Sequence, residues 1–202
     1  MTTPAALAEL LRAELATHAD PARAPGMQAY MRSTIPFHGI GAAPLEQLCR
    51  PLLDLHRLPD EAAWRAAVVD LWDHVAHREE WYAALHLAGH RHYRAFQQPR
   101  TLELYRHLVV TGAWWDVVDW VASRRVGPIL RTHPTEVAPL LRAWSVADDL
   151  WLRRTAIISQ LGSGADTDTD LLVDVIDANL DGSDRRSPAE SPYGREFFIR
   201  KA

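Results

Sequence analysis

The sequence lacks the features that are typical of secreted and membrane proteins. A single cysteine, Cys49, occurs among 202 residues, so no internal disulfide can form. No apolar run reaches about 18 residues, the length that a transmembrane helix needs. The N-terminus lacks the basic segment of a signal peptide. These absences predict a cytoplasmic protein without a membrane partner.

Lysine is almost absent too. Of 22 basic residues only Lys201 is a lysine, and the net charge is −4. General basicity therefore does not indicate a nucleic acid partner, although the planar guanidinium groups suit phosphate and carboxylate. A DNA-binding interpretation requires the arginines to cluster on one face. No Gly-rich phosphate loop, Gly-x-Ser-x-Gly or Cys-x-x-Cys motif occurs, which disfavours the hydrolases and kinases that carry them.

Strand patterns are missing as well, because no segment alternates with a period of two. Helical periodicity and caps instead predict an all-α fold of antiparallel neighbouring helices. Thr3 and Asp60 are predicted N-caps, and 181–192 is a predicted loop. The other predicted helices span about 25–33, 44–55, 79–96, 100–111, 113–125, 128–132, 134–146, 148–161 and 168–180. The predicted apolar stripes are Leu7, Leu10, Leu11 and Leu15; Leu45, Leu48, Leu52 and Leu55; and Trp64, Val68, Leu71 and Trp72.

A weak repeat suggests how these helices stack. The segment beginning at Trp151, Trp-Leu-Arg-Arg, is echoed about 47 residues later by Phe-Ile-Arg-Lys from Phe198, a spacing within the range of HEAT repeats. We therefore expect one domain over 1–202, built as a HEAT-like superhelix of stacked helix pairs. Because 196–202 has the pattern of a helix beginning, we also expect further C-terminal helices to be missing.

Three tryptophans and two aspartates fall within 114–120. At about 100° per residue, Trp114 joins the apolar stripe of the helix 113–125 and is predicted to be core. Trp115 and Asp119, four residues apart, share a flank about 130° away from that stripe. An aromatic plane beside a carboxylate is a plausible site. The alternative is a boundary tryptophan with an aspartate that serves the helix dipole.

Two further groups invite functional hypotheses. Arg154 lies on the apolar side of helix 148–161, whereas Arg153 points away. An arginine there is costly unless an anion meets it, so Arg154 either binds phosphate or pairs with an internal aspartate. His86 and His90 have the i, i+4 spacing of a zinc pair, but His92 is predicted to face away from both. No His-Glu-x-x-His motif supports a metal site.

The segments 27–32 (Met-Gln-Ala-Tyr-Met-Arg), 36–40 (Pro-Phe-His-Gly-Ile), 114–119 (Trp-Trp-Asp-Val-Val-Asp) and 151–157 (Trp-Leu-Arg-Arg-Thr-Ala-Ile) together resemble the DNA alkylation repair family, the AlkD-type DNA glycosylases with HEAT-like repeats. The resemblance covers about 27–202. The family usually follows its Phe-x-Gly-Ile with Pro-x-x-Arg, but here Pro44 is followed by Leu45, Glu46 and Gln47, with no arginine.

The resemblance implies excision of cationic alkylated purines, of the 3-methyladenine and 7-methylguanine type, from double-stranded DNA. It implies that Asp119 is the catalytic carboxylate, that Trp115 packs on the lesion's sugar, and that Arg154 and Tyr30 contact DNA. No metal or cofactor is implied, and we expect a monomer. Two alternatives remain, namely a non-enzymatic helical module that binds DNA or a protein, and a zinc protein that uses His86 and His90.

Overall fold

The computed structural model describes residues 2–180, 198, 199, 201 and 202. Within these residues the regular structure is entirely helical, which confirms the all-α, solenoid-like class. The chain divides into two compact units, Met1–Phe96 and Gln97–Ala202, each considered by itself below. No helix among the described residues has the length and apolar character needed to cross a membrane.

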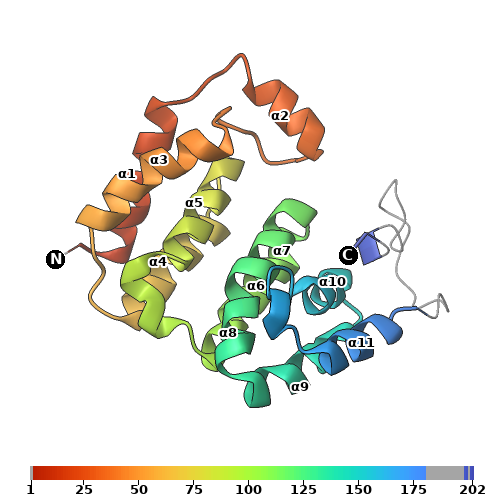
Figure 1. Cartoon of the computed structure of the whole chain (residues 1–202). Helices are drawn as coiled ribbons and strands as arrows, with labels where there is room; N and C mark the ends of the chain where they lie inside the picture. Colours follow the sequence, from red (N-terminus) through yellow and green to blue (C-terminus); the bar gives the residue numbers. More distant parts are fainter. Residues whose placement is uncertain (1, 181–197, 200) are drawn as a thin grey trace. The chain divides into compact units, whose positions relative to one another are not determined.

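The first unit contains five α-helices and one 3₁₀ helix among its described residues (Figure 1). They are α1 (Pro4–Thr17), α2 (Ala24–Met31), α3 (Ala42–Leu55), α4 (Glu61–Asp73), α5 (Arg78–Ala88) and η1 (Arg91–Phe96). The predicted caps are confirmed, since the side chains of Thr3 and Asp60 accept hydrogen bonds from the N–H groups of Ala6 and Ala63. Each cap satisfies one of the N–H groups that a helix start leaves unpaired.

Tryptophans join α4 and α5 into an antiparallel pair. The predicted stripe of Trp64, Val68, Leu71 and Trp72 is fully confirmed as buried. At one end of the pair the Trp64 indole donates to the Leu87 carbonyl, and at the other the rings of Trp72 and Trp81 stack with centroids 4.7 Å apart. Stacking of two large aromatic rings contributes beyond their buried area. The two tryptophans therefore fix the register of this helix pair.

The loop between α2 and α3 is fixed by hydrogen bonds to a buried carboxylate. Glu79 is 0% exposed and accepts hydrogen bonds from the backbone N–H groups of His38, Gly39 and Ile40. Gly39 has φ +90°, and a Cβ there would lie 2.2 Å from the carbonyl oxygen of Asp20. Only glycine fits such a position. The Pro-Phe-His-Gly-Ile segment thus has a structural role, as the cover of a buried glutamate.

The second unit contains the remaining described helices. They are η2 (Pro99–Thr101), α6 (Leu102–Gly112), α7 (Trp115–Val121), the π-helical turn η3 (Ala122–Val126), α8 (Gly127–Thr132), α9 (Pro134–Ser145), α10 (Leu150–Ile158), η4 (Gly164–Asp166) and α11 (Thr169–Asp177). Arg142 of α9 pairs with Asp174 of α11, and the backbone carbonyl of Ser145 accepts from Asn179 just after α11. Partners therefore follow in rising order along both segments, so the two helices run parallel. Alternate helices of a stacked array are related in this way.

Several helix predictions were wrong in detail. The predicted helix 79–96 is two elements, because α5 ends at Ala88 and Gly89 caps it before η1. The predicted helix 113–125 begins later, since Ala113 has φ +40° and Trp114 is the extended N-cap of α7. Two leucines in predicted apolar stripes are exposed instead: Leu10 at 39% and Leu55 at 76%. The predicted loop 181–192 lies outside the described residues.

The single cysteine takes the core position that the predicted stripe of α3 assigned to leucines. Cys49 is 1% exposed and lies between the buried Leu45 and Leu53. Burial, together with the charge of Glu14, raises the pKa of Cys49 to about 12. The thiol therefore stays protonated at neutral pH and acts as a small apolar group rather than as a nucleophile.

Candidate functional site

A bidentate ion pair lies between α7 and α10 in the second unit. The guanidinium of Arg154 donates from Nε to Oδ1 of Asp119 at 2.6 Å and from Nη2 to Oδ2 at 2.7 Å. The Arg154 side chain is 8% exposed, whereas that of Asp119 is 32% exposed. Two parallel, charge-assisted hydrogen bonds fix both the position and the orientation of the carboxylate. Asp119 is thus presented at the surface by a buried arginine.

The same arginine also contacts the end of the chain. Nη1 of Arg154 donates to the carbonyl oxygen of Phe198 at 2.5 Å. The Phe198 ring packs on Trp151 with centroids 5.0 Å apart and on Trp114 with centroids 5.6 Å apart. The sequence echo of Trp151 and Phe198 therefore marks two aromatic residues that touch. Sequence reasoning found this echo but not the contact, nor the role of Trp114 in it.

Trp115 and Asp119 lie one turn apart on α7, which begins at Trp115. Both side chains are half-buried, while Val117, Val118 and Val121 on the same helix are fully buried. This places an indole and a carboxylate together at the edge of the packed surface. The core prediction for Trp114 was wrong, because this residue precedes the helix as its N-cap and is only half-buried.

A π-helical turn follows directly on α7. Such turns insert a residue into a helix and occur often at functional sites. Within it the Arg124 guanidinium lies over the Trp120 ring, 4.7 Å from the ring centroid. After it, a Cβ on Gly127 would lie 2.2 Å from the Ser159 carbonyl oxygen, so α8 packs directly against the backbone at the end of α10. The turn thus places an exposed cation over the Trp120 indole.

The remaining predicted site residue, Tyr30, lies on α2 of the first unit and is 74% exposed. Within the second unit, the structure pairs Asp119 with Arg154 and places Trp115 one turn from Asp119 on α7. Arg153 does not point into solvent as predicted, since it is 7% exposed and its Nη1 donates to the Ala147 carbonyl.

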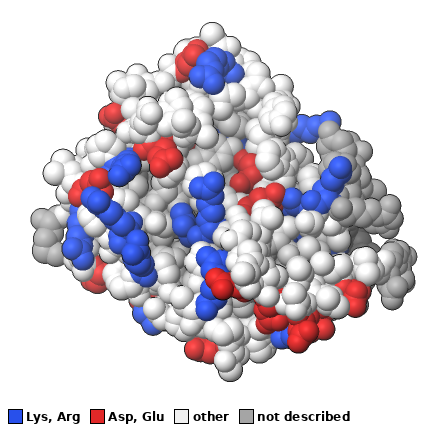
Figure 2. Space-filling model, in the orientation of Figure 1, with Lys and Arg blue, Asp and Glu red and all other residues white. Residues whose placement is uncertain are grey.

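Charge is not segregated on the visible surface. Figure 2 shows basic and acidic side chains interspersed over the face it presents, rather than one face of a single sign. Any affinity for DNA would therefore depend on particular arginines and aromatic residues more than on a general positive field.

Two groups of possible metal ligands occur among the described residues, both in the first unit. One is His38, His77 and Glu80, and the other is Asp54, His90 and His92. His92 was predicted to face away from His90, but their ring centroids lie 4.6 Å apart. The reason is the end of α5 at Ala88, after which the 3₁₀ turn brings His92 back beside His90.

Comparisons with known proteins agree with the fold. A family model described as DNA alkylation repair enzyme matches residues 11–202. A solved structure described as a predicted DNA alkylation repair enzyme from Enterococcus faecalis is similar, with a TM-score of 0.72 and 28% sequence identity. That similarity covers 91% of this chain and 78% of the other. A search of curated proteins finds no match. Since the family model spans nearly the whole sequence, the chain belongs to the DNA alkylation repair enzyme family.

Proposed function

We propose that this protein is a DNA glycosylase that excises cationic alkylated purines, such as 3-methyladenine and 7-methylguanine, from double-stranded DNA. The observation that carries the proposal is the half-exposed Asp119 carboxylate, which lies one turn from Trp115 and is held by the buried Arg154. Membership of the DNA alkylation repair family supports a role in DNA repair.

Release of an alkylated purine requires few groups besides Asp119 and Trp115. An alkylated purine carries a positive charge, so its glycosidic nitrogen leaves readily with the bonding electron pair and the base becomes neutral. The positive charge then develops on the sugar, where the carboxylate of Asp119 would stabilise it. Water adds to the anomeric carbon and loses a proton, which leaves an abasic sugar. In this mechanism Asp119 also orients the water, and Trp115 packs against the sugar.

Arg154 has donors to spare for the DNA backbone. A guanidinium offers five N–H groups. Two of these bind Asp119 and one binds the Phe198 carbonyl. The remaining two could bind a phosphate next to the lesion. A phosphate there would offset the charge of Arg154, so that the negative charge of Asp119 acts more fully on the cationic sugar.

The partner in this proposal is duplex DNA, which a monomer binds in the cytoplasm at the nucleoid. Tyr30, exposed on α2, would supply an additional aromatic contact to the DNA. A salt titration tests the phosphate contact. The logarithm of the affinity should fall linearly with the logarithm of salt concentration, and Arg154→Gln should reduce the slope by roughly 0.9 for one lost phosphate contact.

The decisive experiment measures release of 7-methylguanine from methylated duplex DNA by Asp119→Asn. We expect release to fall roughly 100-fold or more, since one electrostatic group at a reacting centre contributes about that much. Asp174→Asn is the matched control, because it removes an exposed carboxylate of the same unit that pairs with Arg142. Unchanged release by Asp119→Asn would refute the catalytic assignment. If the unaltered protein binds duplex without releasing the base, the non-enzymatic module is the correct alternative.

A further inference from the structure

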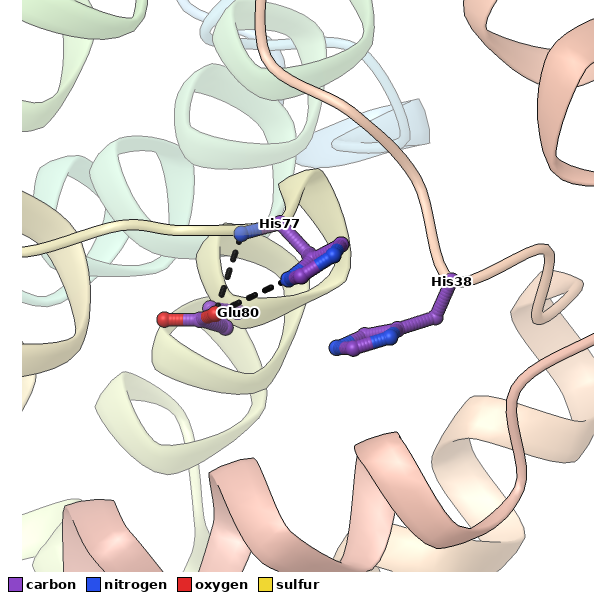
Figure 3. Close-up of side chains that lie close together, drawn as sticks. All are labelled: His38, His77 and Glu80. Carbon is purple, nitrogen blue, oxygen red and sulfur yellow. Dashed lines mark hydrogen bonds and ion pairs between the residues drawn. The ribbon is translucent and has the colours of Figure 1, made fainter.

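The two groups of possible metal ligands in the first unit differ in the stacking contacts and hydrogen bonds that their side chains already make. Figure 3 shows the first, in which the rings of His38 and His77 stack with centroids 3.7 Å apart and planes 17° apart. Lone pairs of imidazole lie in the ring plane, so two stacked rings cannot direct them at one ion. Glu80 is also occupied, accepting from Arg12 and from the N–H groups of Ala76 and His77. We assign no ligand to this first group.

The second group connects the end of α3 to the segment after α5. Nε2 of His90 lies 2.9 Å from Oδ1 of Asp54, and Nη2 of Arg91 lies 2.8 Å from the same oxygen. A carboxylate accepts hydrogen bonds, so His90 donates to Asp54 from Nε2.

This hydrogen bond determines the tautomer of His90. In the neutral imidazole with its proton on Nε2, the other ring nitrogen, Nδ1, carries a bare lone pair that can bind a metal ion.

Among the described residues, that lone pair has no protein partner. Nδ1 of His90 is buried there without a hydrogen-bonding group, and so is Nδ1 of His92. The side chain of His90 is only 10% exposed. Buried polar atoms are nearly always paired, and an unpaired one calls for a water or an ion. Two such nitrogens on neighbouring rings, whose planes are 88° apart, do not have the parallel geometry that excludes the first group.

We propose that His90 and His92 are the nitrogen ligands of a divalent transition-metal ion, Zn²⁺ being the probe of choice, with Asp54 as the carboxylate that orients His90. One potential ligand atom from each of these three residues lies within 4.8 Å of the others. Imidazole suits zinc and its neighbours in the first transition row. Histidines that bind metals usually donate their second ring N–H to a carboxylate, as His90 does to Asp54. Asp54, with a side chain 32% exposed, places the group at the surface of the unit.

Such an ion would tie the last turn of α3 to the turn that follows α5. His90 and Asp54 are 36 positions apart in the sequence. An ion bound only by the folded state stabilises that state in proportion to its occupancy. The role is structural and lies in the first unit, so it is independent of the proposed glycosylase chemistry of Asp119.

The test titrates Zn²⁺ into the full chain after metal has been removed with a chelator, using calorimetry and thermal unfolding. We expect one bound zinc, with an affinity on the order of micromolar, and a midpoint of unfolding that rises with zinc. His92→Ala and His92→Gln should abolish binding. Asp54→Asn should weaken it by roughly 10- to 100-fold, as loss of an orienting partner does.

His74→Ala is the matched control, because His74 forms an Asp–His pair with Asp70 and has a side chain 75% exposed. It should leave zinc binding unchanged, and so should His77→Ala. Circular dichroism of each variant without zinc establishes that the helices are intact. Absence of stoichiometric zinc would overturn the proposal. So would zinc affinity that survives both His92 variants, or that is lost in His77→Ala instead.

Discussion

The ion pair between Asp119 and Arg154 can be measured by a double-mutant cycle that combines Asp119→Asn with Arg154→Met. Asp119→Asn keeps the shape of the side chain but places an amide N–H₂ where the buried guanidinium needs an acceptor. Arg154→Met keeps most of the apolar volume and leaves Asp119 able to turn toward water. The single changes and the double change separate the pair's interaction from the other effects of each residue.

The expected coupling energy between Asp119 and Arg154 follows from the burial of the two side chains. Exposed ion pairs couple by about 0.2–1 kcal/mol, whereas removing one partner of a buried pair costs about 3–5 kcal/mol. Here the arginine side chain is 8% exposed and the aspartate side chain is 32% exposed, with both hydrogen bonds at 2.6–2.7 Å. We therefore expect a coupling energy of about 1–3 kcal/mol, with Asp119→Asn the more destabilising single change.

The assay is urea unfolding of the four proteins at low and high salt, followed by circular dichroism. Arg142 and Asp174 form a matched reference pair, since their N–O distance is 2.7 Å but their side chains are 43% and 53% exposed. Its coupling should stay below about 1 kcal/mol and fall with salt. A coupling for Asp119 and Arg154 no larger than that of the reference pair would refute the reasoning.

Two further predictions concern the first unit. Gly39→Ala should destabilise the protein by more than about 2 kcal/mol in urea unfolding, because of its positive φ and the close carbonyl, whereas Gly26→Ala, in a helix with open space, should stabilise it by about 0.5–1 kcal/mol. Equal effects would contradict the strain argument. Burial and the neighbouring His77 lower the pKa of His38 from 6.5, so the unfolded state binds more protons below that pH and stability should fall on acidification. When unfolding is measured at about pH 7.5 and about pH 5.5, His38→Gln should lose less stability on acidification than the unaltered protein. An equal loss in both proteins would refute the role of His38.

Local sequence signals were sufficient to predict a helix where its N-cap, its apolar face and its end agree. The segment after Asp60 is such a case, because the cap and the stripe from Trp64 to Trp72 are both found as predicted. The predicted apolar stripe of α3 was wrong by one position, because Cys49 and Leu53 are buried while Leu55 is exposed. A leucine-rich helix offers two nearly equal faces, and only the neighbouring helices choose between them.

The candidate site was predictable in part. The placement of Trp115 and Asp119 on a flank of α7 follows from helical spacing alone, and the structure has them one turn apart at the edge of the packed surface. Their roles in catalysis stay a prediction. Sequence spacing left two outcomes for Arg154, a phosphate ligand or an internal pair. The structure pairs it with Asp119, and its contact with a phosphate stays a prediction.

The sequence by itself determined the helical class, most helix boundaries and the family, because caps, period and motifs are local properties of the chain. Tertiary structure alone decided which distant groups meet: Asp119 with Arg154, Trp151 with Phe198, and Asp54 with His90. Each of these pairs joins two elements whose approach depends on packing of whole helices. No pattern within either segment encodes that approach, so the chemistry of both candidate sites becomes visible only in the folded chain.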